Sequence, residues 1–278
     1  MQETYAQINS LRLCIASWGD GPAVVVSHGW CDHAGSWNQF ATHMAAAGYK
    51  VIIPDQRGFG KSEHCPQSSH YHFPDYVADL AAVIQHFQLD KYVLIGHSMG
   101  GTVTTLLTAL HSHPPQRLLL IDGLGPQSES PELARARYQQ HLLSRQNPRK
   151  HTPMKSLHIA AEKFRRMNPY LSLRESTALI SRVVYSKENE FYWRWDSRHR
   201  EKAAISFCAQ RHQQILAAIK CPTHLIFGST SWYHHLPDLD ARKDAIEAPC
   251  ETHWLDSGHS PHLECPHALA TLVLSVLA

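Results

Sequence analysis

Short runs of apolar, often β-branched residues alternate with longer segments of helical periodicity along much of this chain. This alternation is typical of a mostly parallel sheet whose strands are joined by crossover helices. Eight runs are predicted as strands, at residues 5–9, 11–16, 23–27, 50–54, 92–95, 117–121, 223–227 and 252–255. The first two predict an opening hairpin. Helices are predicted at residues 36–47, 73–87, 102–111 and 266–277.

The regular alternation stops at Gly123 and resumes near Ile205. The intervening stretch is charged, helix-prone and poor in strand patterns, with helices predicted at residues 132–145 and 155–167. About eighty residues is too long for one strand-to-helix connection. We therefore expect a helical cap at residues 123–205, inserted into a core domain made of residues 1–122 and 206–278. The alternative interpretation is a set of ordinary crossover helices with long loops.

Composition supports a globular protein and excludes several classes of partner. The 278 residues are 43% hydrophobic, enough for a substantial core. The net charge is only +2 and the basic residues are scattered, so no nucleic-acid partner is expected. No apolar run approaches the length of about 20 residues that spans a bilayer, so no membrane partner is expected either. The start of the sequence does not resemble a signal peptide.

Cysteine and histidine are the residue types that could indicate disulfides or metals. Seven widely spaced cysteines without a C-x-x-C motif are typical of reduced thiols, which predicts a cytoplasmic protein. The 22 histidines include no H-E-x-x-H motif and no His/Cys cluster at zinc-finger spacing. We expect surface histidines, no metal and no cofactor.

A serine follows the fifth predicted strand, in the motif Gly96-His97-Ser98-Met99-Gly100. The motif lies between an apolar run and a predicted helix, which is the strand, turn and helix context of a nucleophile elbow. A serine on such a turn exposes its hydroxyl. Each glycine is expected because a Cβ there would clash with the neighbouring strand or helix. Ser98 is therefore the candidate nucleophile.

A serine hydroxyl needs a base to remove its proton, and His259 is the candidate. It follows the last predicted strand, so it falls at the same edge of the sheet as Ser98. The surrounding loop is built of turn residues, which allows the imidazole to reach inward. His262 is the main competitor for this role. His97 also lies near the serine, but on the turn itself, where it is expected to point elsewhere.

The residue that orients the base should lie between the serine and the histidine in chain order. Asp122 ends the predicted strand at residues 117–121 and is favoured. The other possible place is the loop that ends at Ser231, but its nearest carboxylates, Asp238 and Asp240, come seven and nine residues later. These two carboxylates remain the alternatives.

Acyl transfer also needs donors for the oxyanion, and two backbone N–H groups are candidates. One belongs to Met99, directly after the nucleophile. The other belongs to Trp30 in His28-Gly29-Trp30, after the third predicted strand. A further loop, residues 55–62, carries glycines but no phosphate-binding motif, so we predict a structural turn held by the side chain of Asp55 or Arg57.

These motifs together resemble the α/β-hydrolase superfamily along nearly the whole chain, in the family's order and spacing. Within it, the chain looks most like the serine-hydrolase-like group. The resemblance rests on the following pieces: His28-Gly29-Trp30-Cys31-Asp32, Asp55-x-Arg57-Gly58-x-Gly60-x-Ser62, the elbow with Gly101, Ile121-Asp122-Gly123, Trp193-Arg194-Trp195-Asp196 and Gly258-His259. It implies an eight-stranded sheet flanked by helices and a catalytic triad. Many relatives place the acid after the seventh strand, where this chain has Ser231, so either the acid has moved to Asp122 or the triad is incomplete.

The predicted function is a serine hydrolase of carboxylesterase type that cleaves an ester or related acyl bond of a small, partly apolar substrate. Four aromatic residues are candidates for a substrate pocket beneath the cap: Trp37, Phe191, Trp193 and Trp195. Residues 29–33 are also similar to a loop of cofactor-free quinolone dioxygenases, which use the histidine to deprotonate a substrate that reacts with oxygen. Met99 stands where those proteins have a histidine. A non-catalytic binding protein on the same fold is the remaining alternative.

Overall fold

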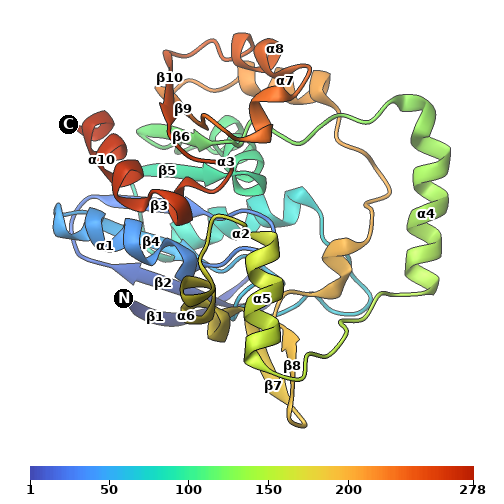
Figure 1. The fold of residues 1–278 in the computed structure, drawn as a ribbon. Helices are drawn as coiled ribbons and strands as arrows, with labels where there is room; N and C mark the ends of the chain where they lie inside the picture. The colour runs from blue at the N-terminus through green and yellow to red at the C-terminus, as the bar shows by residue number, and fades with distance from the viewer.

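The computed structural model describes residues 1–278 and contains one eight-stranded sheet. The spatial order of its strands is β1-β2-β4-β3-β5-β6-β9-β10 (Figure 1). The strands are β1 (Gln2–Ile8), β2 (Leu11–Trp18), β3 (Ala23–Ser27), β4 (Lys50–Pro54), β5 (Tyr92–His97), β6 (Arg117–Ile121), β9 (Thr223–Gly228) and β10 (Cys250–Leu255). All eight predicted strands are confirmed, and the architecture is the α/β-hydrolase fold with a mixed, mostly parallel sheet.

The pairing of the strands explains their sequence patterns. β1 pairs antiparallel with β2, and β2 pairs antiparallel with β4, so the predicted opening hairpin is present. The remaining neighbours are parallel. The central strands β3, β5 and β9 are buried along their whole length, which is why they read as continuous apolar runs rather than alternating ones.

Helices cover both faces of the sheet. They are α1 (Asn38–Ala46), α2 (Phe73–His86), α3 (Met99–Leu110), α7 (Ala209–Ala217), α8 (Leu239–Asp244), α9 (Pro261–Glu264) and α10 (Pro266–Leu277). Alternate residues of each strand enter two separate cores: Ile95 and Ile53 pack with α1 and α10, whereas Leu94 and Ile52 pack with α2 and α3. The sequence pattern does not predict α7, α8 or α9.

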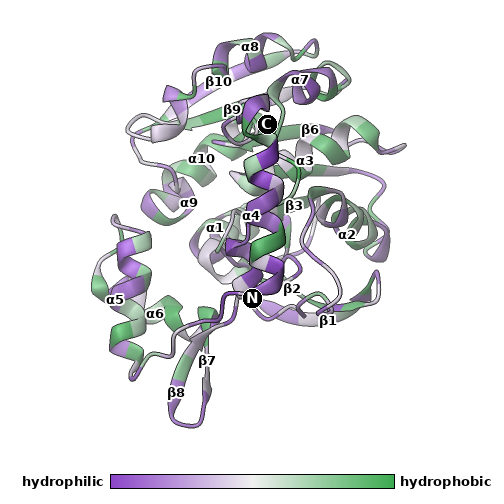
Figure 2. Cartoon of the chain, turned by 90° about the vertical axis from the view of Figure 1, so that its right-hand side faces the viewer, coloured by the Kyte–Doolittle hydropathy of each residue, from purple (hydrophilic) through white to green (hydrophobic).

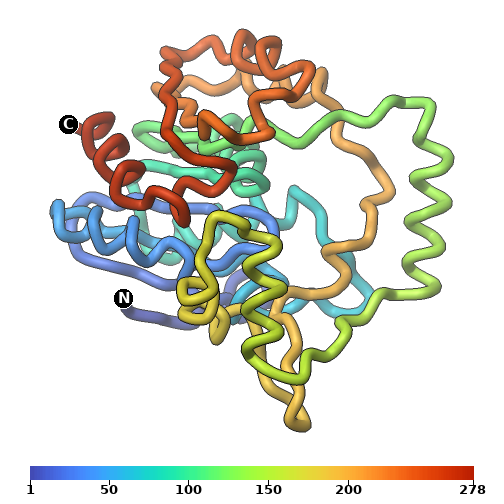
Figure 3. The backbone as a smooth tube through the Cα atoms, viewed as in Figure 1, coloured from blue at the N-terminus to red at the C-terminus, as the bar shows by residue number.

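Residues 123–205 leave the end of β6 and return to the sheet only at α7 (Figure 3). They form α4 (Ala134–Gln146), α5 (Leu157–Met167), α6 (Leu173–Val183) and a hairpin of β7 (Val184–Lys187) and β8 (Glu190–Trp193). The sequence predicts α4 and α5 but neither α6 nor the hairpin. α4 buries none of its residues and stands apart from the sheet (Figure 1). Figure 2 shows that much of this helix is hydrophilic. Among all the helices, none combines the length and the apolar character that crossing a bilayer requires.

Candidate active site

Ser98 lies on a strained turn between β5 and α3. Its φ is +53°, in the region that few non-glycine residues adopt. A Cβ on Gly96 would overlap Thr104 and the backbone of α3, and a Cβ on Gly100 would overlap the backbone of Ser27. Both glycines are therefore required for the chain to reverse so tightly, as the sequence predicts, and the strain is concentrated at the serine.

The structure brings Ser98, His259 and Asp122 together from three different loops. His259 Nε2 lies 3.0 Å from Ser98 Oγ, and His259 Nδ1 lies 3.0 Å from Asp122 Oδ2. Asp122 is fully buried, whereas the His259 side chain keeps about a quarter of its surface open. In this arrangement Nδ1–H donates to the carboxylate and Nε2 accepts from the serine hydroxyl. This is the geometry of a serine, a base and an orienting acid.

The alternative carboxylates do not approach His259. Asp238 pairs with Arg242 at 2.8 Å on α8, and Asp240 is largely exposed and pairs with Lys243 at 2.6 Å. Ser231 marks the place where many relatives have the acid. Its hydroxyl donates to Asp122 Oδ2 at 2.6 Å. The loops after β6 and β9 therefore meet at one carboxylate, and the serine on the second loop supports the aspartate on the first.

The alternative histidines do not contact Ser98 Oγ. His97 is buried, its Nε2 donates to the carbonyl oxygen of His259 at 2.7 Å, and burial holds its pKa well below the usual range. His262 is also buried. Its Nε2 lies 3.2 Å from Asp32 Oδ2, and its ring stacks on Trp37 with ring centroids 4.2 Å apart.

A metal ion could be held at a buried cluster beside the site, formed by Asp32, His97 and His262. Their ligand atoms lie within 4.8 Å of one another.

The loop that carries Trp30 passes directly beside the elbow. A Cβ on Gly29 would lie 3.3 Å from Cβ of Ser98, so only glycine permits this approach without displacement. The N–H of Trp30 has no hydrogen-bond partner within the protein. Met99 is the first residue of α3, where the N–H has no partner within the helix. Both amides are free to bind a ligand near Ser98.

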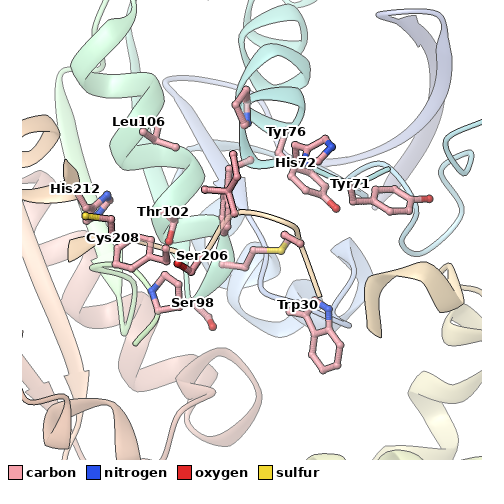
Figure 4. A pocket seen from close by; sticks show the side chains of 18 of the residues that line it. Trp30, Tyr71, His72, Tyr76, Ser98, Thr102, Leu106, Ser206, Cys208 and His212 are labelled. Carbon is pink, nitrogen blue, oxygen red and sulfur yellow. The ribbon is translucent and has the colours of Figure 1, made fainter. Parts of the chain in front are cut away.

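A cavity of about 710 Å³ opens at Ser98 and Met99 (Figure 4). Its size is within the range of ligand-binding pockets. Its wall combines aromatic and aliphatic side chains with a few polar groups. Lining residues include Trp30, Tyr71, Tyr76, Leu106, Ile205, Phe207, Trp232 and Tyr233. His259 and Trp232 also border a second cavity of about 310 Å³.

The four aromatic residues predicted for the substrate pocket lie away from the cavity at Ser98; they are Trp37, Phe191, Trp193 and Trp195. None of the four borders the cavity at Ser98. Trp37 is fully buried in the core beside α1, where its indole donates to Asp32 at 3.1 Å. Phe191 and Trp193 belong to β8 and Trp195 follows it, and all three pack in the larger core cluster of the protein. Trp195 only supports the wall, with its ring 6.2 Å from that of Trp30.

The turn at residues 55–62 is structural, as predicted. The Asp55 carboxylate accepts from the backbone N–H of Ala34 at 2.7 Å and of Lys61 at 2.8 Å. Arg57 donates through two nitrogens to Asp79, each at 2.6 Å. These contacts fix the turn. They also connect it to Ala34, shortly before α1, and to Asp79 on α2.

Comparison with known proteins agrees with the fold described above. The family model described as alpha/beta hydrolase fold matches residues 22–266. A serine hydrolase-like protein of Danio rerio is 26% identical, with 94% of this chain and 83% of that protein covered. Serine hydrolase-like protein 2 of Homo sapiens is 23% identical, with 96% and 90% covered. Among solved structures, a thioesterase domain from the curacin biosynthetic pathway has a TM-score of 0.90 and 26% identity, with 99% of each chain covered.

Proposed function

This chain belongs to the α/β-hydrolase family, and on that premise we propose that it is a serine hydrolase of carboxylesterase type. Its substrate is a small, partly apolar ester or related acyl compound. The observation that carries the proposal is the relay from Ser98 through His259 to Asp122, with both hydrogen-bond distances at 3.0 Å, opening onto an apolar cavity. The relatives named serine hydrolase and thioesterase support the same class of chemistry.

In the proposed mechanism Ser98 Oγ attacks the carbonyl carbon while His259 Nε2 takes its proton. The carbonyl oxygen becomes an oxyanion, which the N–H groups of Trp30 and Met99 stabilise. His259 then protonates the leaving group, and the acyl group remains on the serine. A water molecule, deprotonated by His259, attacks the acyl-serine. His259 then returns this proton to Ser98 Oγ as the bond to the acyl group breaks and the acid is released.

The surroundings of His259 stabilise the imidazolium that forms during both steps. Asp122 supplies a buried negative charge on one side. The rings of Trp232 and Tyr233 lie 5.0 and 6.0 Å from the imidazole, close enough for their electron-rich faces to favour a cation. The partial exposure of His259 leaves room for the water that deacylation needs.

We also propose that residues 123–205 act as a cap over the core formed by residues 1–122 and 206–278. Arg137 of α4 lines the cavity together with Ala203 and Ile205 at the end of this insertion. Arg137 Nε donates to the carbonyl oxygen of Ala203 at 2.9 Å, which ties α4 to the returning segment. The cap therefore supplies one wall of the cavity and would select among acyl groups.

Labelling with a fluorophosphonate probe tests the proposal. The wild-type protein should form a covalent adduct on Ser98, and Ser98→Ala should form none. Ser112→Ala is the matched control because Ser112 lies in the exposed loop after α3 and should label as the wild type does. Absence of an adduct that depends on Ser98 would exclude the serine hydrolase mechanism.

A further inference from the structure

Three side chains with metal-ligand chemistry gather at the amino ends of β9 and β10, at the opposite edge of the sheet from Ser98. His224 is the second residue of β9, and Glu251 is paired with it in the adjacent strand β10. His253 follows Glu251 by two residues, so the two side chains lie on the same face of β10. The parallel register therefore brings together residues that are 27 and 29 positions apart in the sequence.

The distances among the three ligand atoms fit one small ion. His224 Nδ1 lies 3.2 Å from His253 Nε2, and Glu251 Oε2 lies 3.7 Å from the first nitrogen and 3.8 Å from the second. A tetrahedral zinc ion with bonds of about 2.0–2.1 Å separates its ligand atoms by about 3.4 Å. The three atoms thus already form one triangular face of such a tetrahedron.

The accessibility of the cluster also suits a metal. Glu251 is mostly exposed, which leaves a route to solvent. The cluster borders a cavity of about 440 Å³, which is also lined by Arg117 and by the end of α10. A water molecule from this cavity can fill the remaining coordination position.

We propose that His224, Glu251 and His253 form a binding site for a divalent transition metal of the zinc type. Two imidazoles and one carboxylate are ligands that such ions prefer. The metal would bridge β9 to the edge strand β10 and stabilise their pairing. The site lies away from the reacting groups, so this role is structural and independent of the proposed hydrolase activity.

Zinc binding to the metal-free protein, without a purification tag, tests the site. Equilibrium dialysis should give one zinc per chain in the wild type, and His253→Gln should weaken this binding at least about tenfold. Glu251→Gln should also weaken it, and as an exposed substitution it leaves folding intact. His86→Gln is the matched control, since His86 is an exposed histidine on α2, and it should bind zinc as the wild type does.

Thermal unfolding gives a second readout that does not depend on activity. At a free zinc concentration of 100 times the dissociation constant, the midpoint should rise by about 5 °C in the wild type and not in His253→Gln. Unchanged zinc binding in both His253→Gln and Glu251→Gln would overturn the proposal. Loss of binding in His262→Gln instead would also overturn it, because the metal would then lie at the buried cluster of Asp32, His97 and His262.

Discussion

Replacing Asp122 by Asn should remove most of the catalytic power that His259 supplies. The carboxylate is fully buried, and its Oδ2 lies 3.0 Å from His259 Nδ1. When the imidazole takes the proton of Ser98, it gains a positive charge that faces this carboxylate. For unit charges at this separation, Coulomb's law with an effective dielectric constant of about 20 gives about 5.5 kcal/mol. Since about 1.4 kcal/mol corresponds to tenfold in rate, Asp122→Asn should lower kcat by about four orders of magnitude.

The assay is steady-state hydrolysis of a p-nitrophenyl ester, with the thermal midpoint measured for each variant to confirm folding. Asp238→Asn is the matched control, because Asp238 is a paired carboxylate on the neighbouring segment that does not touch His259. It should keep kcat within a factor of about three. A folded Asp122→Asn variant with kcat within tenfold of the wild type would refute the reasoning, and so would an equal loss in Asp238→Asn.

Three further substitutions test contacts around the site and in the core. Ser231→Ala removes a donor to Asp122 and should lower the free energy of unfolding by about 1.5 kcal/mol in urea titration, with a much smaller loss of kcat than Asp122→Asn. Arg57→Ala leaves Asp79 buried without its partner and should lower the same free energy by about 3–5 kcal/mol. Burial lowers the pKa of His199 to about 3, so its contribution to stability is complete above about pH 6.5 and is lost as the pH falls. Between pH 7 and pH 5, the free energy of unfolding should therefore fall by about 2 kcal/mol less in His199→Phe than in the wild type. An equal fall in both proteins would contradict this assignment.

The strands are predictable from the sequence because burial dictates their composition. β3 and β5 are covered by helices on both faces, so an apolar side chain is required at nearly every position. The β7–β8 hairpin is hidden because its turn residues, Glu188 and Asn189, adopt positive φ without a glycine to indicate it. For α6 the sequence does contain a signal: Ser172 and Glu175 form a capping box at its start, a pattern typical of a helix N-terminus.

The lining of the cavity is less predictable than the elbow. Ser98 is fixed by local constraints, since the two glycines and the flanking elements define its turn. The lining depends on how distant segments pack, and an aromatic side chain suits a core and a pocket equally well. Trp37 and Trp193 are buried, whereas Trp232 and Phe207 border the cavity, although composition does not distinguish these pairs.

The proposed acid lies where two loops meet, which explains why the sequence alone leaves several carboxylates as candidates for this role. β6 and β9 are neighbouring parallel strands, so the loops at their carboxyl ends begin about 5 Å apart. A side chain on either loop can therefore reach the same nitrogen of the histidine. Here Asp122 occupies the first loop, and Ser231 on the second donates to it, so the same point in space is filled from both strands. The order of residues along the chain therefore does not by itself determine which of the two loops carries the acid. The residues of both loops have to be considered together.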